Sequence, residues 1–510
     1  MPRMTGQEPQ RFPTSLRATA SRLPVPWQRL HLVGVCGAGM KALAELLTDC
    51  GCQLSGSDQQ LPTPAVSALI HRGLKFRRGH AADHVAAQTQ ALVYSPAVPA
   101  DNPERQHATQ AGLPQYSYTQ FLGLLMQQRT GVCIAGTHGK STTAAMTGLL
   151  LTDAGRSPSV VLGAELSDGG RSGWAGTGDL LVVESCEFQR SFLELSPRYA
   201  TILNIETDHF DCYPDLAAVT DAFGEFAERI EPRDGVLIIR GNCAAAVAAA
   251  ERTSARVVTL GLASGSDWWA DDVRRTPDGI RFRAYSGDSF FAEISLQIGG
   301  RHNVWNALAA VALGEAVGLS ARDIREGLAE FRGIRRRLEL VGSWRGVTLL
   351  DDYGHHPTAV RATLETVREQ FGRRRVWCVF QPHQVSRTTA LMNDFAGAFG
   401  AADEILIAPT FAARERMTTE PAEVSRQLAE LLVERGQSAR FLDSLDQITA
   451  TLDDALEPGD VLITVGAGDI DQVHHEFTRR VQRHPASRRA FGSLHLDEAG
   501  RSRTVLPHSA

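Results

Sequence analysis

Short apolar runs alternate with longer mixed stretches along most of the chain. A short apolar run is typical of a strand that is buried on both faces, and the longer stretches suit helices that cover a sheet. Near the start, the pattern predicts strands at Leu30–Val35, Gln53–Gly56 and Leu92–Tyr94 and a helix over Ala42–Leu47. The alternation predicts an α/β fold with parallel sheets that are covered on both faces.

The alternation continues in two further groups, which are separated by a hinge that we expect at Phe331-Arg332-Gly333. In the first group the expected strands are Val132–Ala135, Leu180–Val183, Ala200–Asn204 and Val236–Ile239. In the second group the expected strands are Val347–Leu350, Arg375–Phe380, Glu404–Ala408 and Asp460–Val465, with a helix over Ala359–Phe371. At about 150 residues per domain, the length of the chain also suits three domains.

The composition argues against a nucleic-acid-binding, membrane-spanning or secreted protein. A formal net charge of −6 lacks the positive excess of a nucleic-acid-binding domain. No apolar run is long enough for a transmembrane helix, and residues 1–26 contain no hydrophobic signal core. Eight scattered cysteines without a CxxC pair favour reduced thiols. We therefore expect a cytoplasmic protein that has neither nucleic acid nor membrane as a partner.

A glycine-rich loop follows the expected strand at 132–135. The loop and the start of the next helix contain Gly136, Thr137, His138, Gly139, Lys140, Ser141 and Thr142. Glycines let backbone N–H groups face phosphates, and the helix N-terminus adds the positive end of its dipole. Lys140 would reach the β- and γ-phosphates and Ser141 a Mg²⁺ ion. The alternative is a glycine turn that only starts a helix.

Acidic residues and a histidine follow two other expected strands. Glu184 and Glu187 come after one strand, and Asp208-His209 comes shortly after the other. Because the carboxyl ends of parallel strands line the ligand-binding edge of an open sheet, these groups should lie beside the phosphate loop. Glu184 is a suitable Mg²⁺ ligand, with Ser141 and His209 as further ligands. The alternative for His209 is a helix-capping or core histidine.

Three more clusters contain chemically useful side chains. Asn303 and Asn306 lie one helical turn apart, so their amides could bind an adenine edge or could simply cap the helix. The other two clusters are Asp351-Asp352-Tyr353-Gly354-His355-His356-Pro357-Thr358 and Phe380-Gln381-Pro382-His383 with Ser386-Arg387-Thr388.

The order of these motifs resembles one enzyme family. The motifs GTHGKST, Asn204-Ile205-Glu206 with Asp208-His209, GRHNxxNAxAA, DDYGHHPT and FQPHxxSRT are similar to those of the Mur ligases. The resemblance covers about residues 29–475, and it includes Gly37-Ala38-Gly39-Met40, Ser55–Asp58, Asn102-Pro103-Glu104 and Val465–Ile470.

The resemblance implies an ATP-dependent ligase of peptidoglycan precursor synthesis that works through an acyl phosphate, with Mg²⁺. It implies UDP-N-acetylmuramate and L-alanine as the substrates. It also implies a Rossmann-like UDP-sugar-binding domain over 28–126, a central P-loop-type ATP-binding domain over 127–333 and a Rossmann-like amino-acid-binding domain over 334–482. A flexible arm over 1–27 and a flexible tail over 483–510 would complete the chain.

The resemblance assigns roles residue by residue. Lys140, Glu184 and His209 match catalytic and metal-binding positions. His302, Asn303, Asn306 and Asp352 match the nucleoside part of the ATP site. Gly37, Ala38, Gly39, Asp58, His80 and Ser95 match the UDP-sugar side. Tyr353, His355, His383 and Arg387 match the amino-acid site, where the fork of Arg387 suits a carboxylate.

Five positions depart from the family pattern and concern substrate choice more than reaction class. Gln384 and Val385 replace a usual Arg-Tyr, which removes one cation from the amino-acid site. Ala359 stands where a glutamate is common, as it does in the related ligase that attaches a recycled peptide. Cys186 makes the metal loop less acidic, and Cys36 replaces a glycine.

Four functions therefore compete. They are the alanine-adding ligase, a ligase for a recycled tripeptide or another amino acid, a dinucleotide-dependent dehydrogenase, and a non-catalytic nucleotide-binding homologue. The glycine spacing argues against the dehydrogenase hypothesis, because Gly34, Gly37 and Gly39 do not have the G-x-G-x-x-G spacing. The retained Lys140, Glu184 and His209 argue against a non-catalytic homologue.

Overall fold

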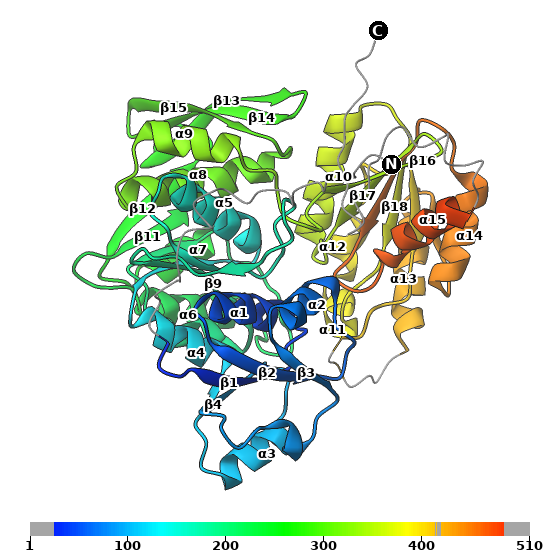
Figure 1. Cartoon of the computed structure of the whole chain (residues 1–510). Coiled ribbons are helices and arrows are strands. Elements are labelled where there is room, and N and C mark those ends of the chain that lie inside the picture. Colours follow the sequence, from blue (N-terminus) through cyan, green and yellow to red (C-terminus); the bar gives the residue numbers. More distant parts are fainter. Residues whose placement is uncertain (1–24, 414, 416–419, 484–510) are drawn as a thin grey trace, which may run out of the picture. The chain divides into compact units, whose positions relative to one another are not determined.

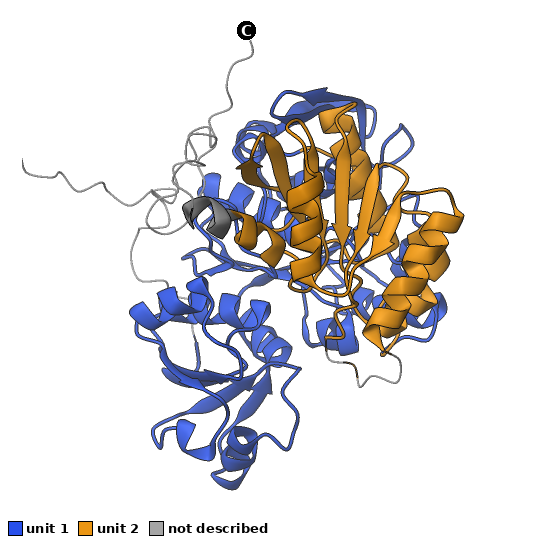
Figure 2. Ribbon diagram, turned by 90° about the vertical axis from the view of Figure 1, so that its right-hand side faces the viewer, with its two compact units in different colours: residues 1–207, 212–298, 302–334 blue, residues 208–211, 299–301, 335–510 orange. Residues whose placement is uncertain are grey.

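The computed structural model describes residues 25–413, 415 and 420–483 in two compact units (Figure 2). Of the described residues, the first unit contains 25–207, 212–298 and 302–334, and the second contains 208–211, 299–301 and those from 335 to 483. The expected arm and tail lie outside the described residues, apart from 25–27 and 483. Trp27 packs on the first core, with its ring centroid 5.1 Å from that of Tyr116.

The first unit begins with a five-stranded parallel sheet in the order β3-β2-β1-β4-β5 (Figure 1). Its strands are β1 Arg29–Val33, β2 Gln53–Asp58, β3 Lys75–Arg78, β4 Ala91–Tyr94 and β5 Gln115–Ser117. Its helices are α1 Ala38–Asp49, α2 Pro64–His71, η2 Ala82–His84, α3 Pro103–Gln110 and α4 Tyr118–Met126. The first strand stops at Val33, before the expected end at Val35, because Gly34 has a φ of +82°.

The second sheet of this unit has ten strands in the order β15-β14-β13-β12-β11-β10-β6-β9-β7-β8. Its strands are β6 Thr130–Ala135, β7 Ser159–Val161, β8 Gly173–Trp174, β9 Leu180–Glu184, β10 Tyr199–Ile202, β11 Val236–Arg240, β12 Arg256–Gly261, β13 Trp268–Thr276, β14 Gly279–Ser286 and β15 Ser289–Leu296. The helices are α5 Lys140–Asp153, η3 Phe188–Glu194, α6 Leu216–Ala227, α7 Ala244–Ala250, α8 Arg301–Ala316 and α9 Ala321–Ala329.

Both ends of this sheet correct the expectation of parallel pairing. β13, β14 and β15 pair antiparallel, and β8 pairs antiparallel with β7. In β14, Ile280 and Phe282 are buried, whereas Arg281 and Arg283 are exposed. This alternation is typical of an antiparallel strand with one face in water, and a search for continuous apolar runs does not detect it.

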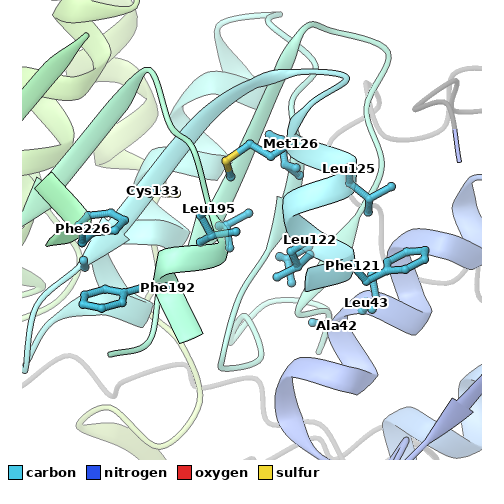
Figure 3. Close-up of a cluster of buried hydrophobic side chains, with 14 of the residues drawn as sticks. Ala42, Leu43, Phe121, Leu122, Leu125, Met126, Cys133, Phe192, Leu195 and Phe226 are labelled. Carbon is cyan, nitrogen blue, oxygen red and sulfur yellow. The ribbon is translucent and has the colours of Figure 1, made fainter. Parts of the chain in front are cut away.

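A buried cluster joins α4 to the elements around it within the first unit (Figure 3). Phe121 and Leu122 of α4 belong to the same core as Phe192 and Leu195. The close approach requires Gly123, because a Cβ there would lie 2.4 Å from the carbonyl oxygen of Glu194. Burial of each such large side chain stabilises the folded state by about 1.5–3 kcal/mol. The helix α4 therefore belongs to the same core as its neighbours.

The second unit is built on a six-stranded sheet in the order β16-β17-β21-β18-β19-β20, parallel except for β16. Its strands are β16 Glu339–Trp344, β17 Val347–Asp352, β18 Val376–Phe380, β19 Glu404–Ile407, β20 Ala439–Phe441 and β21 Val461–Val465. Its helices are α10 Pro357–Phe371, α11 Val385–Ala390, α12 Met392–Ala396, α13 Pro421–Glu434, α14 Leu445–Ala455 and α15 Gln472–Arg483.

This sheet is covered on both faces, as the continuous apolar runs predict. Phe380 and Ile463 belong to one core cluster, and their neighbours Val379 and Leu462 belong to another. Successive side chains of a strand point to opposite faces, so the two clusters lie on opposite sides of the sheet. The α/β fold class is thus confirmed, and the domain boundaries stay predictions. None of the helices within the described ranges is long and apolar enough to cross a membrane.

Candidate functional site

The glycine loop between β6 and α5 adopts a shape that its glycines make possible. Gly136 has a φ of +137°, and Gly139, at the N-cap of α5, has a φ of +84°. Among the described residues no side-chain cap of α5 is formed, since its N-cap residue is a glycine, and the first N–H groups of a helix have no intrahelical acceptor. This geometry suits a phosphate cradle, and phosphate binding at the loop stays a prediction.

Asn204 fixes the loop from the neighbouring strand. Its Oδ1 accepts the backbone N–H of His138 at 2.8 Å, and its Nδ2 donates to the carbonyl of His138 at 3.1 Å. Thr137 donates its own N–H to the carbonyl of Asn204, and its hydroxyl accepts the N–H of Glu206. Asn204 is thus a functional residue without a role predicted from the sequence, although its position just beyond β10 is a signal.

Asn306 lies directly beneath the same loop. A Cβ on Gly139 would approach Oδ1 of Asn306 to 2.3 Å, so only glycine fits there. Asn306 also donates to Oδ1 of Asn303 at 3.0 Å, and both amides are buried. His302, one residue earlier in α8, is half-buried. These contacts give the two asparagines a structural task at the loop, and their adenine contact stays a prediction.

Lys140 folds back over the loop. Its Nζ donates to the carbonyls of Gly136 and Thr137 and lies 2.9 Å from Oε2 of Glu187. Burial alone would lower the pKa of Lys140, but the charge of Glu187 raises it above the ordinary value. The ammonium group is therefore cationic and sits at the mouth of the loop. Thr142 is buried in the first turn of α5.

Ser141 and Glu184 form an oxygen-rich pair beside this lysine. The Ser141 hydroxyl donates to Oε1 of Glu184 at 2.9 Å. Oε2 of Glu184 accepts the N–H of Gly163 at 2.7 Å, and a Cβ on Gly163 would clash with this carboxylate. A hydroxyl and a carboxylate in contact suit a hard cation such as Mg²⁺. Gly163 is a second residue that sequence reasoning missed.

Cys186, between the two glutamates, adds no negative charge. Burial, together with the charge of Glu187, raises the pKa of this thiol to about 12. A neutral thiol is a poor ligand for a hard cation. Of these two side chains, Glu184 is the better suited to the predicted Mg²⁺ site.

The first unit also carries the residues that were expected on the UDP-sugar side. The loop after β1 contains Gly37 and, at the start of α1, Ala38 and Gly39. Asp58 accepts the N–H of Cys36 at 2.8 Å, so its carboxylate holds the loop backbone. Tyr118 lies over Gly39, since a Cβ there would come within 2.8 Å of its ring.

Ser95 and His80 flank the same edge of the sheet. A Cβ on Gly34 would lie 2.9 Å from Cβ of Ser95. The two loops can therefore approach this closely only because residue 34 is a glycine. Nδ1 of His80 lies 3.0 Å from the hydroxyl of Ser57 at the end of β2. These residues thus lie at the carboxyl ends of the strands, where open α/β sheets bind ligands.

In the second unit, Tyr353, His355 and His383 form a ring cluster. The ring centroids of Tyr353 and His355 are 5.6 Å apart, and those of His355 and His383 are also 5.6 Å apart. Phe411, which sequence reasoning missed, stacks on His383 with centroids 5.8 Å apart. Burial, with the nearby Arg387 cation, lowers the pKa of His355 well below its ordinary value.

Arg387 is already engaged within the second unit. Its Nε donates to Oδ1 of Asp208 at 2.6 Å, and one terminal nitrogen contacts His383. Burial alone would raise the pKa of Asp208, but the Arg387 guanidinium lowers it below the ordinary value. If Arg387 binds the carboxylate of the amino acid, it must do so while it also bonds to Asp208 and His383. This contact with the amino acid stays a prediction. His209, next to Asp208, has a φ of +53°.

Asp352 and Gln384 both form hydrogen bonds with backbone groups of the second unit. Asp352 accepts the N–H groups of Gly354 and Leu338 at 2.7 and 2.8 Å. The Gln384 side chain is buried, and the backbone of Gln384 bonds to Phe411 and Thr388. The structure therefore groups the predicted residues into a phosphate-loop cluster and a sugar-side edge in the first unit, and a ring cluster in the second.

Comparisons with known proteins show the family of the chain. Three family profiles match in order: "Mur ligase family, catalytic domain" over 29–130, "Mur ligase middle domain" over 134–314 and "Mur ligase, glutamate ligase domain" over 336–468. A UDP-N-acetylmuramate–L-alanine ligase from Desulfitobacterium hafniense is 37% identical over 448 residues, which are 87% of this chain and 98% of the relative.

Solved structures give the same result. A UDP-N-acetylmuramate–alanine ligase from Thermotoga maritima superposes with a TM-score of 0.75 at 26% identity, covering 89% of this chain and 99% of that chain. A murein peptide ligase from Psychrobacter arcticus superposes with a TM-score of 0.68 at 24% identity, covering 90% of this chain and 99% of that chain. The second likeness shows a shared fold alone.

Proposed function

Because the chain belongs to the Mur ligase family, we propose that it uses ATP to join L-alanine to the carboxylate of UDP-N-acetylmuramate. The observation that carries the proposal is the phosphate-loop cluster. Lys140 and the Ser141–Glu184 pair lie together at the N-terminus of α5, next to a loop that Asn204 and Asn306 hold in shape. This arrangement suits phosphoryl transfer.

The chemistry explains why a phosphate site is needed. A carboxylate is a poor electrophile toward an amine. Transfer of the γ-phosphoryl group of ATP to a carboxylate oxygen gives an acyl phosphate and ADP. The amine of alanine then attacks the carbonyl carbon, the C–O bond to phosphate breaks, and a proton leaves the nitrogen. The products are the amide, ADP and inorganic phosphate.

Lys140 supplies the fixed charge for the first step. Its ammonium is held at the loop by two backbone carbonyls and by Glu187. A bound phosphate would share this cation, which would neutralise the charge on the oxygens of the transferring group. Glu184 and Ser141 would hold Mg²⁺, which would supply further charge neutralisation there.

His355 is suited to the second step. Its Nδ1 lies 3.0 Å from the carbonyl oxygen of Tyr353, so Nδ1–H donates and the neutral ring keeps a lone pair on Nε2. Burial lowers the pKa of His355 well below its ordinary value, which favours the neutral ring, so Nε2 can accept a hydrogen bond from the amine of alanine. Tyr353 and His383 flank this ring and would enclose the small side chain of alanine.

The sugar-side edge of the first unit would take the UDP-sugar. The Gly37–Gly39 loop and Ser95 lie at the carboxyl ends of β1 and β4, as a nucleotide site in an open sheet requires. A requirement for ATP and a UDP-sugar supports a reaction in the cytoplasm. Three relatives that are 35–37% identical are named as L-alanine ligases, which supports that amino acid over a recycled tripeptide.

Release of inorganic phosphate tests the proposal. Purified protein is given ATP, Mg²⁺, UDP-N-acetylmuramate and L-alanine, and each component is omitted in turn. We expect phosphate only when all are present, and at least a hundredfold less from Lys140→Ala at an unchanged melting temperature. Phosphate release that does not require the UDP-sugar would contradict the proposal.

A further inference from the structure

A buried carboxylate lies at the centre of four polar side chains in the five-stranded part of the first unit. Glu104, in the first turn of α3, has a fully buried side chain. His31 of β1, Ser57 of β2, His84 of η2 and His80, just after β3, all contact it. These residues come from five separate segments of the chain, and their meeting point is the carboxyl-end edge of the sheet.

The two carboxylate oxygens of Glu104 divide these contacts. Oε2 accepts the Ser57 hydroxyl at 2.6 Å and lies 3.3 Å from Nε2 of His31. Oε1 lies 3.0 Å from Nδ1 of His84 and accepts the N–H of Ala81. Burial alone would raise the pKa of Glu104, but hydrogen bonds from His31 and Ser57 lower it, so the group is an anion.

The direction of the Ser57 hydroxyl proton determines which ring nitrogen of His80 carries a proton. An ionised carboxylate can only accept hydrogen bonds, so the single hydroxyl proton of Ser57 points to Glu104. The Ser57 oxygen must then accept from Nδ1 of His80, which lies 3.0 Å away. Nδ1 of His80 is also 3.5 Å from Oε2 of Glu104. Nδ1 therefore carries a proton, and Nε2 is the ring atom left for another partner.

The network sits directly under the loop expected to bind the UDP-sugar. The Ser57 carbonyl accepts the N–H groups of Gly34 and Val35 at 2.9 and 3.2 Å. The next residue, Asp58, holds the N–H of Cys36. Nε2 of His80 has no hydrogen-bond partner within the part of the chain that the structure describes, and its side chain is 12% exposed.

We propose that Glu104 is a positioning residue for the UDP-sugar: through Ser57 it fixes the Nδ1–H form of His80 and so presents Nε2 to the nucleotide. This inference rests on the proposed function only in the identity of the ligand. Glu104 itself is buried and touches no ligand. Its effect on binding passes through the orientation and tautomer of His80, in the way that a second group sets the tautomer of a catalytic imidazole.

Two measurements test the proposal, and UDP alone is the probe. Calorimetry gives the Kd for UDP of the full-length parent, Glu104→Gln and Glu104→Asp. Histidine-selective ¹⁵N NMR reports which ring nitrogen of His80 is protonated, with its signals assigned by their loss in His80→Gln. Glu45→Gln is the matched control, because Glu45 is also a buried carboxylate but binds the N–H groups of Ser172 and Gly173.

We expect Glu104→Gln to raise the Kd for UDP about tenfold, which corresponds to the loss of one hydrogen bond between Nε2 of His80 and the nucleotide. Glu104→Asp should restore part of the affinity, and Glu45→Gln should stay within about twofold of the parent. In the parent, Nδ1 of His80 should be protonated, and Glu104→Gln should change that signature. In the ligase assay, Glu104→Gln should raise the KM for the UDP-sugar far more than it lowers kcat.

A Glu104→Gln protein that binds UDP like the parent would overturn the inference, as would a parent with an unprotonated Nδ1 on His80. If Glu104→Gln does not fold, Ser57→Ala takes its place, because it removes the hydroxyl that joins Glu104 to His80. That variant should also weaken UDP binding severalfold, and unchanged affinity would again overturn the inference. A parent that fails to bind UDP would contradict the proposed function as well.

Discussion

The hydroxyl of Ser141 donates a 2.9 Å hydrogen bond to Oε1 of Glu184. Ser141 is the second residue of the helix α5, and Glu184 is the last residue of the strand β9. The phosphate loop connects β6 to α5, and β6 pairs directly with β9, so the two side chains come from neighbouring parts of one sheet edge. The N–H of Gly163 holds the other oxygen of Glu184. The carboxylate is thus fixed beside the phosphate loop before any ligand arrives.

Glu184→Gln should raise the Mg²⁺ concentration needed for half-maximal activity about tenfold or more. An amide keeps the shape and the bond to Ser141, but it removes the anionic oxygen that a hard cation prefers. Initial rates measured against Mg²⁺ concentration at saturating substrates check this. Glu228→Gln, on the exposed partner of Arg252, is the control and should leave the curve unchanged. An unchanged Mg²⁺ dependence for Glu184→Gln would place the metal elsewhere.

Gly139→Ala should abolish ATP turnover, whereas Gly155→Ala should not. Both glycines have positive φ, +84° and +74°, so each substitution costs about 1–2 kcal/mol in backbone strain. A Cβ at Gly139 would also strike Oδ1 of Asn306, whereas nothing lies within 4 Å at Gly155. Melting temperatures and ATP KM values separate strain from damage to the loop. Equal activity of the two variants would refute the close approach of Asn306 to the loop.

Arg387→Lys should raise the KM for the amino acid more than the KM for ATP or the UDP-sugar. Lysine keeps the charge but loses the fork that bonds Asp208 and His383 at once. The poorer pairing of Asp208 should also lower stability by about 1.5–3 kcal/mol. Rate curves in which each substrate is varied in turn give the three KM values, with the exposed Arg426→Lys as the control. A dominant effect on the ATP KM would move the amino-acid site away from this arginine.

His474 should make the second unit less stable in acid. Burial lowers its pKa from 6.5 to about 4, and its Nε2 lies 2.9 Å from the carbonyl oxygen of Leu350. The unfolded chain binds a proton below pH 6.5 while the folded chain stays neutral, so stability falls as the pH drops from 6.5 toward 4. The full loss is about 3 kcal/mol. Thermal melts of His474→Gln should depend less on pH over this range, and identical slopes would contradict the assignment.

The sequence predicts the phosphate loop because its signal is local. The apolar strand, Gly136 and Gly139, and the following Lys140-Ser141 are contiguous, so chemistry and spacing appear together. Strand positions were predicted for the same reason, with ends that shift where a glycine such as Gly34 turns the chain. The antiparallel strands β13–β15 were not predicted, because their polar faces interrupt the apolar runs.

Contacts between distant segments could not be predicted. Nothing near Asn306 indicates that its amide packs under Gly139, so a ligand contact was the natural interpretation of its motif. Arg387 likewise has a buried partner, Asp208, that lies far away in the sequence. Glu104 gathers its partners from separate segments, and sequence spacing carries no signal of that.

The most direct test of the central account is identification of the product by mass spectrometry. The protein is incubated with ATP, Mg²⁺, UDP-N-acetylmuramate and an equimolar mixture of L-alanine, glycine, L-serine and the tripeptide of the recycling reaction. The account predicts UDP-N-acetylmuramoyl-L-alanine as the dominant product, with one ADP and one phosphate formed for each amide. A dominant tripeptide product, or an amide formed without ATP consumption, would contradict it.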